Sequence, residues 1–156
     1  MGYRFVPLRW RDVAAVARWR YSGEYAFYNS TLREMLLIRL AQMGLQLFGR
    51  TIYYSALDSH GELAGIFSFV RRGPTVEIGL GMRPDLTGHG AGREFLEAGL
   101  AFARQQIAPA GFRLDVARFN ERAIRVYEHA GFVATRTFER RVGGKPYEFV
   151  EMVRDV

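Results

Sequence analysis

Three glycines at alternate positions, Gly88, Gly90 and Gly92, stand directly before a segment with the apolar spacing of a helix. The first N–H groups of a helix have no acceptor within the helix and carry the positive end of its dipole. Because glycine has no side chain, an anion can approach these N–H groups closely, and the pattern predicts a phosphate or pyrophosphate site. The alternative is a tight strand-to-helix turn, but three alternating glycines are more than a turn requires.

Two common phosphate-binding loops do not match this one. A P-loop has Gly-Lys-Ser/Thr at the helix start, whereas here Gly92 is followed by Arg93 and Glu94. A dinucleotide-binding loop reads G-x-G-x-x-G, and the spacing here is G-x-G-x-G. Asp115 could imitate the ribose-binding acid of that fold. However, that fold begins with repeated βαβ units, which this sequence does not predict.

The segments before the loop predict two helices and a β-meander. The expected elements are a strand at 3–9, helices at 12–20 and roughly 32–48, and strands at 51–58, 63–72 and 75–82. Asp12 is expected to cap the first helix. Short turns join the last three strands, so we expect these strands to pair antiparallel.

The segments after the loop complete a mixed sheet. The expected elements are a helix ending before Pro109, a strand at 112–117, a helix at 120–131, and a hairpin of 132–142 and 146–156. Asn120 is the expected N-terminal cap of the shorter helix, and Gly131 its stop. The order of elements predicts an α/β fold (an α+β mixed sheet): a mostly antiparallel central sheet flanked by helices, with one parallel crossover.

The composition is that of an ordinary globular protein. The 156 residues are 49% hydrophobic and 24% charged, which predicts one domain over residues 1–156 with a buried core. The sequence has no cysteine, which excludes disulfides, thiolate metal ligands and a cysteine nucleophile. No spacing of His, Asp and Glu indicates a metal site. No segment reaches the length of a membrane span, so we expect a cytoplasmic protein without a membrane partner.

The net charge of +6 comes almost entirely from arginines, since Lys145 is the only lysine. One interpretation is a surface for anionic ligands or nucleic acid. The arginines are spread along the chain and form no dense run, so we expect no nucleic-acid partner.

A second motif follows the strand at 112–117. The pattern Asn-x-x-Ala-apolar-x-apolar-Tyr-x-x-x-Gly-Phe is complete from Asn120 to Phe132. Together with the glycine loop, which follows a strand and Pro84, it resembles the GNAT family of acetyl-CoA-dependent N-acetyltransferases, over residues 62–141. The resemblance implies the GNAT fold, acetyl-CoA as co-substrate and an amine as acceptor. One position departs from the family pattern, because Thr87 stands where the loop usually has Gln or Arg.

The resemblance implies a set of cofactor contacts along the chain. The implied residues are Leu80 and Met82 through their backbone N–H groups, the loop residues Thr87, Gly88, His89, Gly90, Ala91, Gly92 and Arg93, and Asn120. His89 is expected to be an exposed loop residue near the pyrophosphate. With Thr87 in the loop, part of the pyrophosphate contact is expected from Arg83, Arg93 or the backbone alone.

Two residues are candidates for proton transfer. Tyr127 lies two helical turns after Asn120 on the same face, and the resemblance implies that its hydroxyl protonates the leaving thiolate. Glu77 is the candidate base: strand alternation places it with Gly79 and Gly81 on one face, where room is cleared for an acceptor. The resemblance implies that it acts through a water. The alternatives are a core tyrosine and a solvated strand glutamate.

The aromatic segment from Tyr21 to Tyr28 is where relatives build the acceptor pocket, so Tyr25 and Tyr28 are the candidate substrate-binding residues. Glu24 is able to pair with a cationic amine, and packing against the core is the alternative for the rings. We expect an N-acetyltransferase that acts on a primary amine of a small molecule or protein by direct attack in a ternary complex. The alternative is a non-catalytic acyl-CoA-binding module. The final hairpin is able to pair across a homodimer.

Overall fold

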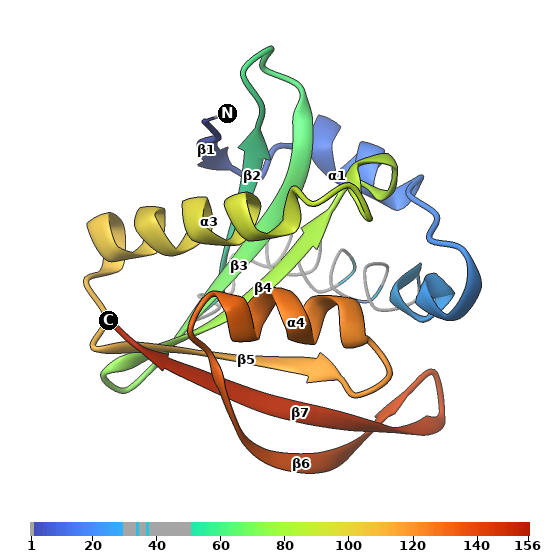
Figure 1. Cartoon of the computed structure of the whole chain (residues 1–156). Coiled ribbons are helices and arrows are strands. Elements are labelled where there is room, and N and C mark those ends of the chain that lie inside the picture. The colour runs from blue at the N-terminus through green and yellow to red at the C-terminus, as the bar shows by residue number, and fades with distance from the viewer. Residues whose placement is uncertain (1, 30–33, 35–36, 38–50) are drawn as a thin grey trace.

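The computed structural model describes residues 2–29, 34, 37 and 51–156. Within these residues, seven strands form one sheet in the order β1-β2-β3-β4-β5-β7-β6 (Figure 1). The strands are β1 (Arg4–Pro7), β2 (Thr51–Leu57), β3 (Leu63–Arg72), β4 (Thr75–Met82), β5 (Gly111–Ala117), β6 (Val133–Val142) and β7 (Lys145–Asp155). The helices are α1 (Trp10–Ala17), α3 (Gly92–Ile107) and α4 (Glu121–His129), with short 3-10 turns η1 (Gly23–Ala26) and η2 (Pro84–Leu86).

The strand pairing confirms the predicted mixed sheet with one parallel crossover. Strands β1 to β4 pair antiparallel in sequence order, as do β5 with β7 and β6 with β7. Strands β4 and β5 pair parallel, and only over Thr75–Glu77 with Gly111–Arg113. In Figure 1 the strands β2, β3 and β4 run steeply, whereas β5, β6 and β7 run across the view, so the sheet opens between β4 and β5.

Helices α3 and α4 lie across the same face of the sheet (Figure 1). The apolar face of α3 packs on the inward side chains of β3, β4 and β5 in the main core. The approach is close, because a Cβ added at Gly99 would lie 2.2 Å from Cε1 of Phe67. The core therefore fixes α3, and with it the glycine loop that precedes α3, against the central strands.

Several predicted boundaries are confirmed. Asn120 caps α4 by accepting a hydrogen bond from the N–H of Ala123 at 3.1 Å. Gly131 follows the helix at a φ of +86°, a conformation that glycine adopts without strain. Helix α3 ends at Ile107, two residues before Pro109. The helix expected over roughly 32–48 lies largely outside the described residues.

The predicted capping role of Asp12 is wrong. Helix α1 begins at Trp10 with Arg9 at the cap position, so Asp12 falls in the first turn. The carboxylate of Asp12 is buried and accepts hydrogen bonds from Arg9 Nε at 2.6 Å and from Ser55 Oγ at 2.7 Å. Burial raises the pKa of Asp12, but the hydrogen bonds from Arg9 and Ser55 outweigh it and leave the pKa lowered. Asp12 therefore ties α1 to β2.

Strand β6 forms one edge of the sheet and is exposed over most of its length. Pairing of this hairpin across a homodimer stays a prediction. Among the described residues, no helix is both long enough and apolar enough to span a membrane.

Candidate active site

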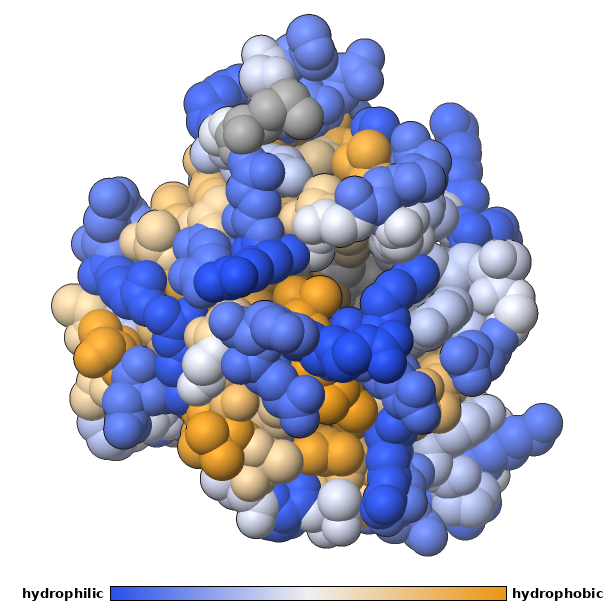
Figure 2. Space-filling view, viewed as in Figure 1, coloured by the Kyte–Doolittle hydropathy of each residue, from blue (hydrophilic) through white to orange (hydrophobic). Residues whose placement is uncertain are grey.

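A cavity of about 520 Å³ opens where β4 and β5 separate, and we call it the β4–β5 cavity. Its walls include Ile78–Met82 of β4 and Leu114–Ala117 of β5, the segments that continue beyond the parallel pairing. Figure 2 shows a hollow near the centre of the face that carries α3 and α4, bordered by hydrophilic side chains. The remaining walls come from the aromatic segment Tyr21–Tyr28 around η1, from β3, from the glycine loop, from α4, and from β6 and β7.

The backbone of β4 presents N–H groups to this cavity. The N–H of Arg83 donates to Ala64 O at 2.8 Å, toward β3. Successive N–H groups of a strand point to opposite edges, so the N–H groups of Leu80 and Met82 point away from β3, to the open edge. Consistent with this, the carbonyl of Met82 is on the open edge and accepts a hydrogen bond from the Tyr21 hydroxyl at 2.6 Å.

The glycine loop borders the cavity. Gly88 and Gly90 have φ values of +78° and +82°, which favour glycine, and both line the cavity together with Thr87, Gly92 and Arg93. The first hydrogen bond within α3 runs from Phe95 N to Ala91 O at 3.0 Å. The N–H groups of the residues before Phe95 at the start of the helix therefore have no acceptor within the helix. His89 is exposed, and neither His89 nor Ala91 is among the lining residues.

Arg83, one of the residues expected to contact the pyrophosphate, does not line the cavity. The guanidinium of Arg83 donates to Asp85 Oδ1 at 2.7 Å and to Leu63 O at 2.9 Å, so its donors are engaged away from the loop. Thr87 itself donates its hydroxyl proton to Pro84 O at 2.7 Å. Arg93, which lines the cavity, and the backbone of the loop stay the expected pyrophosphate contacts, and the fold adds a residue that the sequence argument missed.

That residue is Arg122, in the first turn of α4. Its Nη1 would lie 3.5 Å from a Cβ added at Gly88, and its guanidinium stacks 4.3 Å from the ring centroid of Tyr25. No carboxylate in the described part of the chain lies within ion-pair distance of Arg122. The sequence signal was its place two residues after Asn120, but only the fold brings it beside the glycine loop.

Helix α4 places two predicted residues at the cavity. Asn120 accepts from Ala123 N through Oδ1 and donates from Nδ2 to the Tyr28 hydroxyl at 2.8 Å, so both ends of its amide are bound. Tyr127 lines the same cavity. Burial raises the pKa of Tyr127, with a smaller contribution from Tyr28, so its phenol keeps its proton at neutral pH.

The aromatic segment around η1 forms another wall. Tyr25 and Tyr28 both line the cavity, and burial raises the pKa of Tyr28. Phe27 also packs edge-on against Phe119 and Tyr147, at centroid distances of 5.4 and 4.6 Å. Part of this segment is therefore held by packing. Glu24 is exposed and is not among the lining residues.

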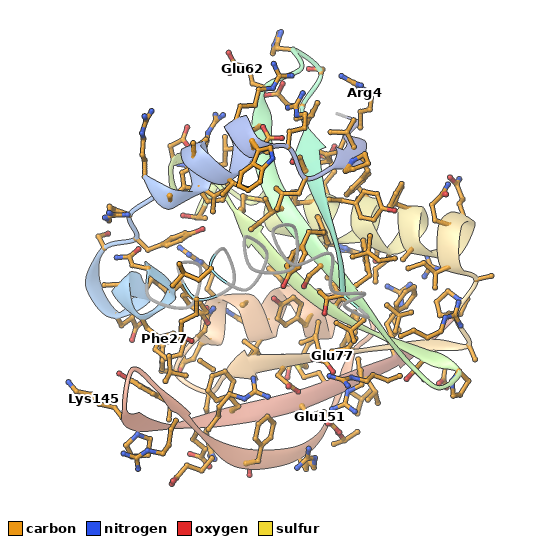
Figure 3. All side chains as sticks on the ribbon, turned by 180° about the vertical axis from the view of Figure 1, so that it is seen from behind. Arg4, Phe27, Glu62, Glu77, Lys145 and Glu151 are labelled. Atoms are coloured by element: carbon orange, nitrogen blue, oxygen red, sulfur yellow. The ribbon has the colours of Figure 1, made fainter. Side chains whose placement is uncertain are left out.

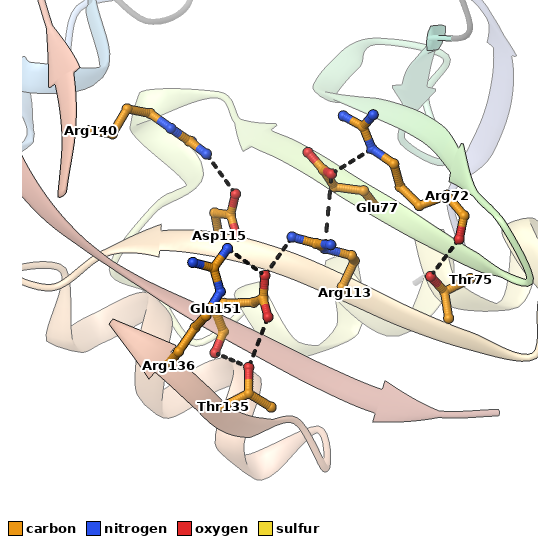
Figure 4. Close-up of polar contacts among 9 residues, drawn as sticks. All are labelled: Arg72, Thr75, Glu77, Arg113, Asp115, Thr135, Arg136, Arg140 and Glu151. Atoms are coloured by element: carbon orange, nitrogen blue, oxygen red, sulfur yellow. Dashed lines mark hydrogen bonds and ion pairs between the residues drawn. The ribbon is translucent and has the colours of Figure 1, made fainter. Parts of the chain in front are cut away.

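Glu77 lies at the paired end of β4, outside the cavity lining. Its Oε2 accepts a hydrogen bond from Arg72 Nε at 3.1 Å and lies 3.9 Å from Arg113 Nε. Arg113 in turn bonds Glu151, which also accepts from Arg136 and Thr135 (Figure 4). Figure 3, the view from behind, shows Glu77 and Glu151 on the face of the sheet opposite to α3 and α4. A direct contact between Glu77 and a ligand in the cavity is not provided by this geometry.

Asp115 is the carboxylate that does line the cavity. Its Oδ2 accepts from Arg140 Nη2 at 2.8 Å, and the side chain is only 9% exposed (Figure 4). The sequence argument considered Asp115 only as a ribose-binding acid of another fold. Strand alternation alone puts Asp115 on the same face as Arg113, but it does not show that β5 has left β4 by this point.

The sequence matches a family model. The model, described as "Acetyltransferase (GNAT) family", matches residues 13–132. The chain belongs to the GNAT acetyltransferase family. Its members use acetyl-CoA and transfer the acetyl group to an amine, and this GNAT chain is an acyltransferase. A search of curated proteins found no match.

Solved structures of GNAT enzymes share this fold. The spermidine N-acetyltransferase from Vibrio cholerae in complex with CoA and spermine aligns with a TM-score of 0.77 at 14% identity, over 99% of this chain and 95% of that one. A chimera of that enzyme aligns with a TM-score of 0.77 at 18% identity, over 99% and 96%. A dodecameric form aligns with a TM-score of 0.72 at 17% identity, over 99% and 94%. At these identities the likeness shows the fold alone.

Proposed function

We propose that this chain transfers an acetyl group from acetyl-CoA to a primary amine in a ternary complex, with no acyl-enzyme. One observation carries the proposal: β4 and β5 separate into a cavity that has the glycine loop on one side and Tyr127 on another. Membership of the acetyltransferase family supports the reaction class. The solved relatives named as spermidine N-acetyltransferases support an amine acceptor.

The described residues fit an acyl-CoA. The loop from Thr87 to Arg93, which includes Gly88, His89, Gly90, Ala91 and Gly92, would bind the pyrophosphate through backbone N–H groups. Arg93 and Arg122 would add the positive charge that Thr87 does not supply. The N–H groups of Leu80 and Met82 would bind the pantetheine arm and the thioester oxygen. Asn120 would contribute by fixing the start of α4, because both ends of its side-chain amide are already bound.

Bound acetyl-CoA would supply a thioester whose carbonyl carbon the neutral amine attacks, so that the C–N bond forms, the C–S bond breaks, and one proton is released overall. Tyr127 is suited to protonate the leaving sulfur, because burial raises its pKa and keeps the phenol protonated. Leu80 and Met82 would stabilise negative charge on the carbonyl oxygen during attack. The hydroxyl of Tyr127 is then restored by the proton that leaves the amine.

The proton of the acceptor ammonium must leave before attack, and we assign its removal to Glu77 acting through a water. A water is required because the Glu77 carboxylate is held by Arg72 and does not line the cavity. Tyr25 and Tyr28 would enclose the body of the acceptor, which is an amine of a small molecule or of a protein.

The rival function is a non-catalytic module that binds acyl-CoA. Two measurements on the purified chain decide between them: calorimetry with acetyl-CoA, and release of coenzyme A thiol in the presence of a panel of amines. The enzyme requires both binding and turnover. Tight binding without turnover of any amine supports the module, and absence of binding removes both functions.

A further inference from the structure

The carboxylate of Asp115 has one oxygen without a partner. Oδ1 is buried and accepts no hydrogen bond within the part of the chain that the structure describes, whereas Oδ2 accepts from Arg140. A buried charged oxygen that lacks a donor costs free energy. Because Asp115 lines the β4–β5 cavity, a cationic ligand there is able to pair with its carboxylate and offset this cost.

Asp115 is also the single acidic residue among the described residues that line the cavity. On the same face of the sheet, Glu77 and Glu151 already accept hydrogen bonds from arginines and lie outside the lining. Residues 30–50 contain one acid in their sequence, Glu34, and its side chain is exposed. Among the described lining residues, the cavity therefore offers one carboxylate to a cationic ligand.

The other charged side chains that the described part of the chain contributes to the lining are arginines: Arg93, Arg122 and Arg140. Arg93 and Arg122 lie on the side of the glycine loop, whereas Arg140 stays beside Asp115. A polyamine would bring further ammonium groups next to Arg140, and the described lining residues hold no second carboxylate to pair them. Like charges close together in a partly desolvated cavity repel, and unpaired charges there cost free energy. A single ammonium avoids both penalties.

The walls on the side of Asp115 are apolar rings. Phe27, Tyr28 and Phe149 line the cavity there, and the guanidinium of Arg140 lies 4.8 Å from the ring centroid of Phe149. Rings of this kind pack well on a flat apolar body, and their faces attract a nearby cation. They provide few polar partners for a hydrophilic chain.

We propose that the acceptor is a primary monoamine with an aromatic or apolar body, whose one ammonium group is bound by the carboxylate of Asp115. The inference rests on the proposed acetyl transfer and names the acceptor class of that same site. It separates this chain from the solved relatives named as acting on spermidine, although the fold is shared.

The first test compares acceptors with the wild-type chain. Thiol release from acetyl-CoA is measured with 2-phenylethylamine, n-butylamine, spermidine and a short peptide with a free N-terminus. We expect kcat/KM for 2-phenylethylamine to exceed that for spermidine by about tenfold or more, with n-butylamine between them. Preference for spermidine or for the peptide over both monoamines overturns the acceptor assignment while leaving acetyl transfer intact. Failure to bind acetyl-CoA, or to acetylate any amine, overturns the proposed function itself.

The second test removes the carboxylate. Asp115→Asn should raise KM for the preferred amine by about tenfold to a hundredfold, since a hydrogen bond to a charged group is lost. The Kd for acetyl-CoA by calorimetry should stay within about twofold, because the residues assigned to the cofactor are untouched. Glu148→Gln is the matched control, because Glu148 is an exposed carboxylate on β7 paired with Arg118. Asp115→Glu should recover part of the lost affinity.

Folding of the variant is checked by circular dichroism, because Asp115→Asn leaves Arg140 without its carboxylate. A folded Asp115→Asn with unchanged KM for the amine overturns the role of Asp115. If Asp115→Asn does not fold, two measurements still test the proposal: KM for the amine in Asp115→Glu, and the acceptor preference of the wild-type chain. A preference of the wild-type chain for the polyamine overturns the proposal.

Discussion

The β4–β5 pair has two ends of opposite character. At the paired end, Thr75–Glu77 lie against Gly111–Arg113, and Glu77 and Arg113 belong to a chain of ion pairs that continues to Glu151. At the open end, the two strands separate and line the cavity with backbone groups. At the paired end, the carboxylates of Glu77 and Glu151 accept hydrogen bonds from arginines, although Nε of Arg113 is buried without one. At the open end, Oδ1 of Asp115 is the buried oxygen without a hydrogen bond in the described part of the chain.

The comparison shows that the separation of two strands creates the site. The inward side chains of β4 are apolar at both ends, whereas its outward positions hold Glu77 at the paired end and Gly79 and Gly81 at the open end. Every buried backbone N–H requires an acceptor, and where the neighbouring strand departs, a ligand is able to take its place. Carboxylates on the same face thus belong to the ion-pair chain at one end and to the cavity at the other.

The largest effect is expected at the open end, from Tyr127→Phe. Loss of the hydroxyl removes the proposed proton donor, and kcat should fall by about a hundredfold or more. The Kd for acetyl-CoA should change little. Thiol release and calorimetry give both values, and Tyr3→Phe serves as the control because Tyr3 contacts the core through Phe95 on α3. Unchanged kcat in Tyr127→Phe would contradict the assignment.

The next effect concerns the glycine loop. Arg122→Gln should raise the Kd for acetyl-CoA by about tenfold to a hundredfold, because a charged contact to phosphate is lost. The salt dependence of that Kd should also become weaker. Arg125→Gln is the matched control on the same helix, since Arg125 is exposed and pairs with Glu121. Equal Kd values for the two variants would remove Arg122 from the cofactor site.

A smaller effect on activity is expected at the paired end. Glu77→Gln should lower kcat by about tenfold, less than the hundredfold or more that is typical of direct proton transfer, because its action requires a water. Glu97→Gln is the control, since Glu97 is a partly buried carboxylate paired with Arg154 on another part of the fold. If kcat is unchanged in Glu77→Gln and only stability falls, the paired end is structural and Glu77 is not the base.

The smallest effect is on stability alone and comes from Glu151→Gln. Burial raises the pKa of Glu151, but hydrogen bonds from Thr135 and Arg136 outweigh it, so the pKa lies below its ordinary value of 4.5. The stabilisation is therefore complete above pH 4.5 and is lost as the pH falls through the lowered pKa. Glu151→Gln should lower the free energy of unfolding by about 1–3 kcal/mol at pH 7.

Urea denaturation at pH 7 and at pH 3 checks this expectation. The gap between wild type and Glu151→Gln should narrow at pH 3, because the unfolded chain, in which this carboxylate has its ordinary pKa of 4.5, binds a proton more readily there than the folded chain does. Glu148→Gln, with its exposed ion pair, should show a much smaller difference at pH 7. A gap that is the same at both pH values would show that the charge of Glu151 does not stabilise the ion-pair chain.

The sequence predicted the fold well because its signals are local. Asn120 and Gly131 mark the two ends of α4, and the Gly143–Gly144 turn joins β6 and β7 with positive φ at both glycines. The cap assigned to Asp12 failed because a tertiary contact competed: Ser55, on β2, binds the carboxylate. Residue type alone does not distinguish a cap from a buried ion pair.

The site was predicted less completely, because its decisive features are not local. Alternation indicated the face on which Glu77 lies, but not that β5 still pairs with β4 at that residue. Arg122 and Asp115 reach the cavity only through the packing of α4 and the departure of β5. The roles of Tyr127, Glu77 and the loop residues stay predictions that the variants above will test.

The register of β3 against β4 has a further consequence. Because the N–H of Arg83 donates to Ala64 O, the amides of Leu80 and Met82 face the opposite edge. Inserting or deleting one residue in β4 would reverse this orientation and turn both amides toward β3. The function of this strand therefore tolerates changes of side chain, within the limits of packing, better than changes of length. A variant with one residue inserted or deleted in β4 should lose acetyltransferase activity even if it folds.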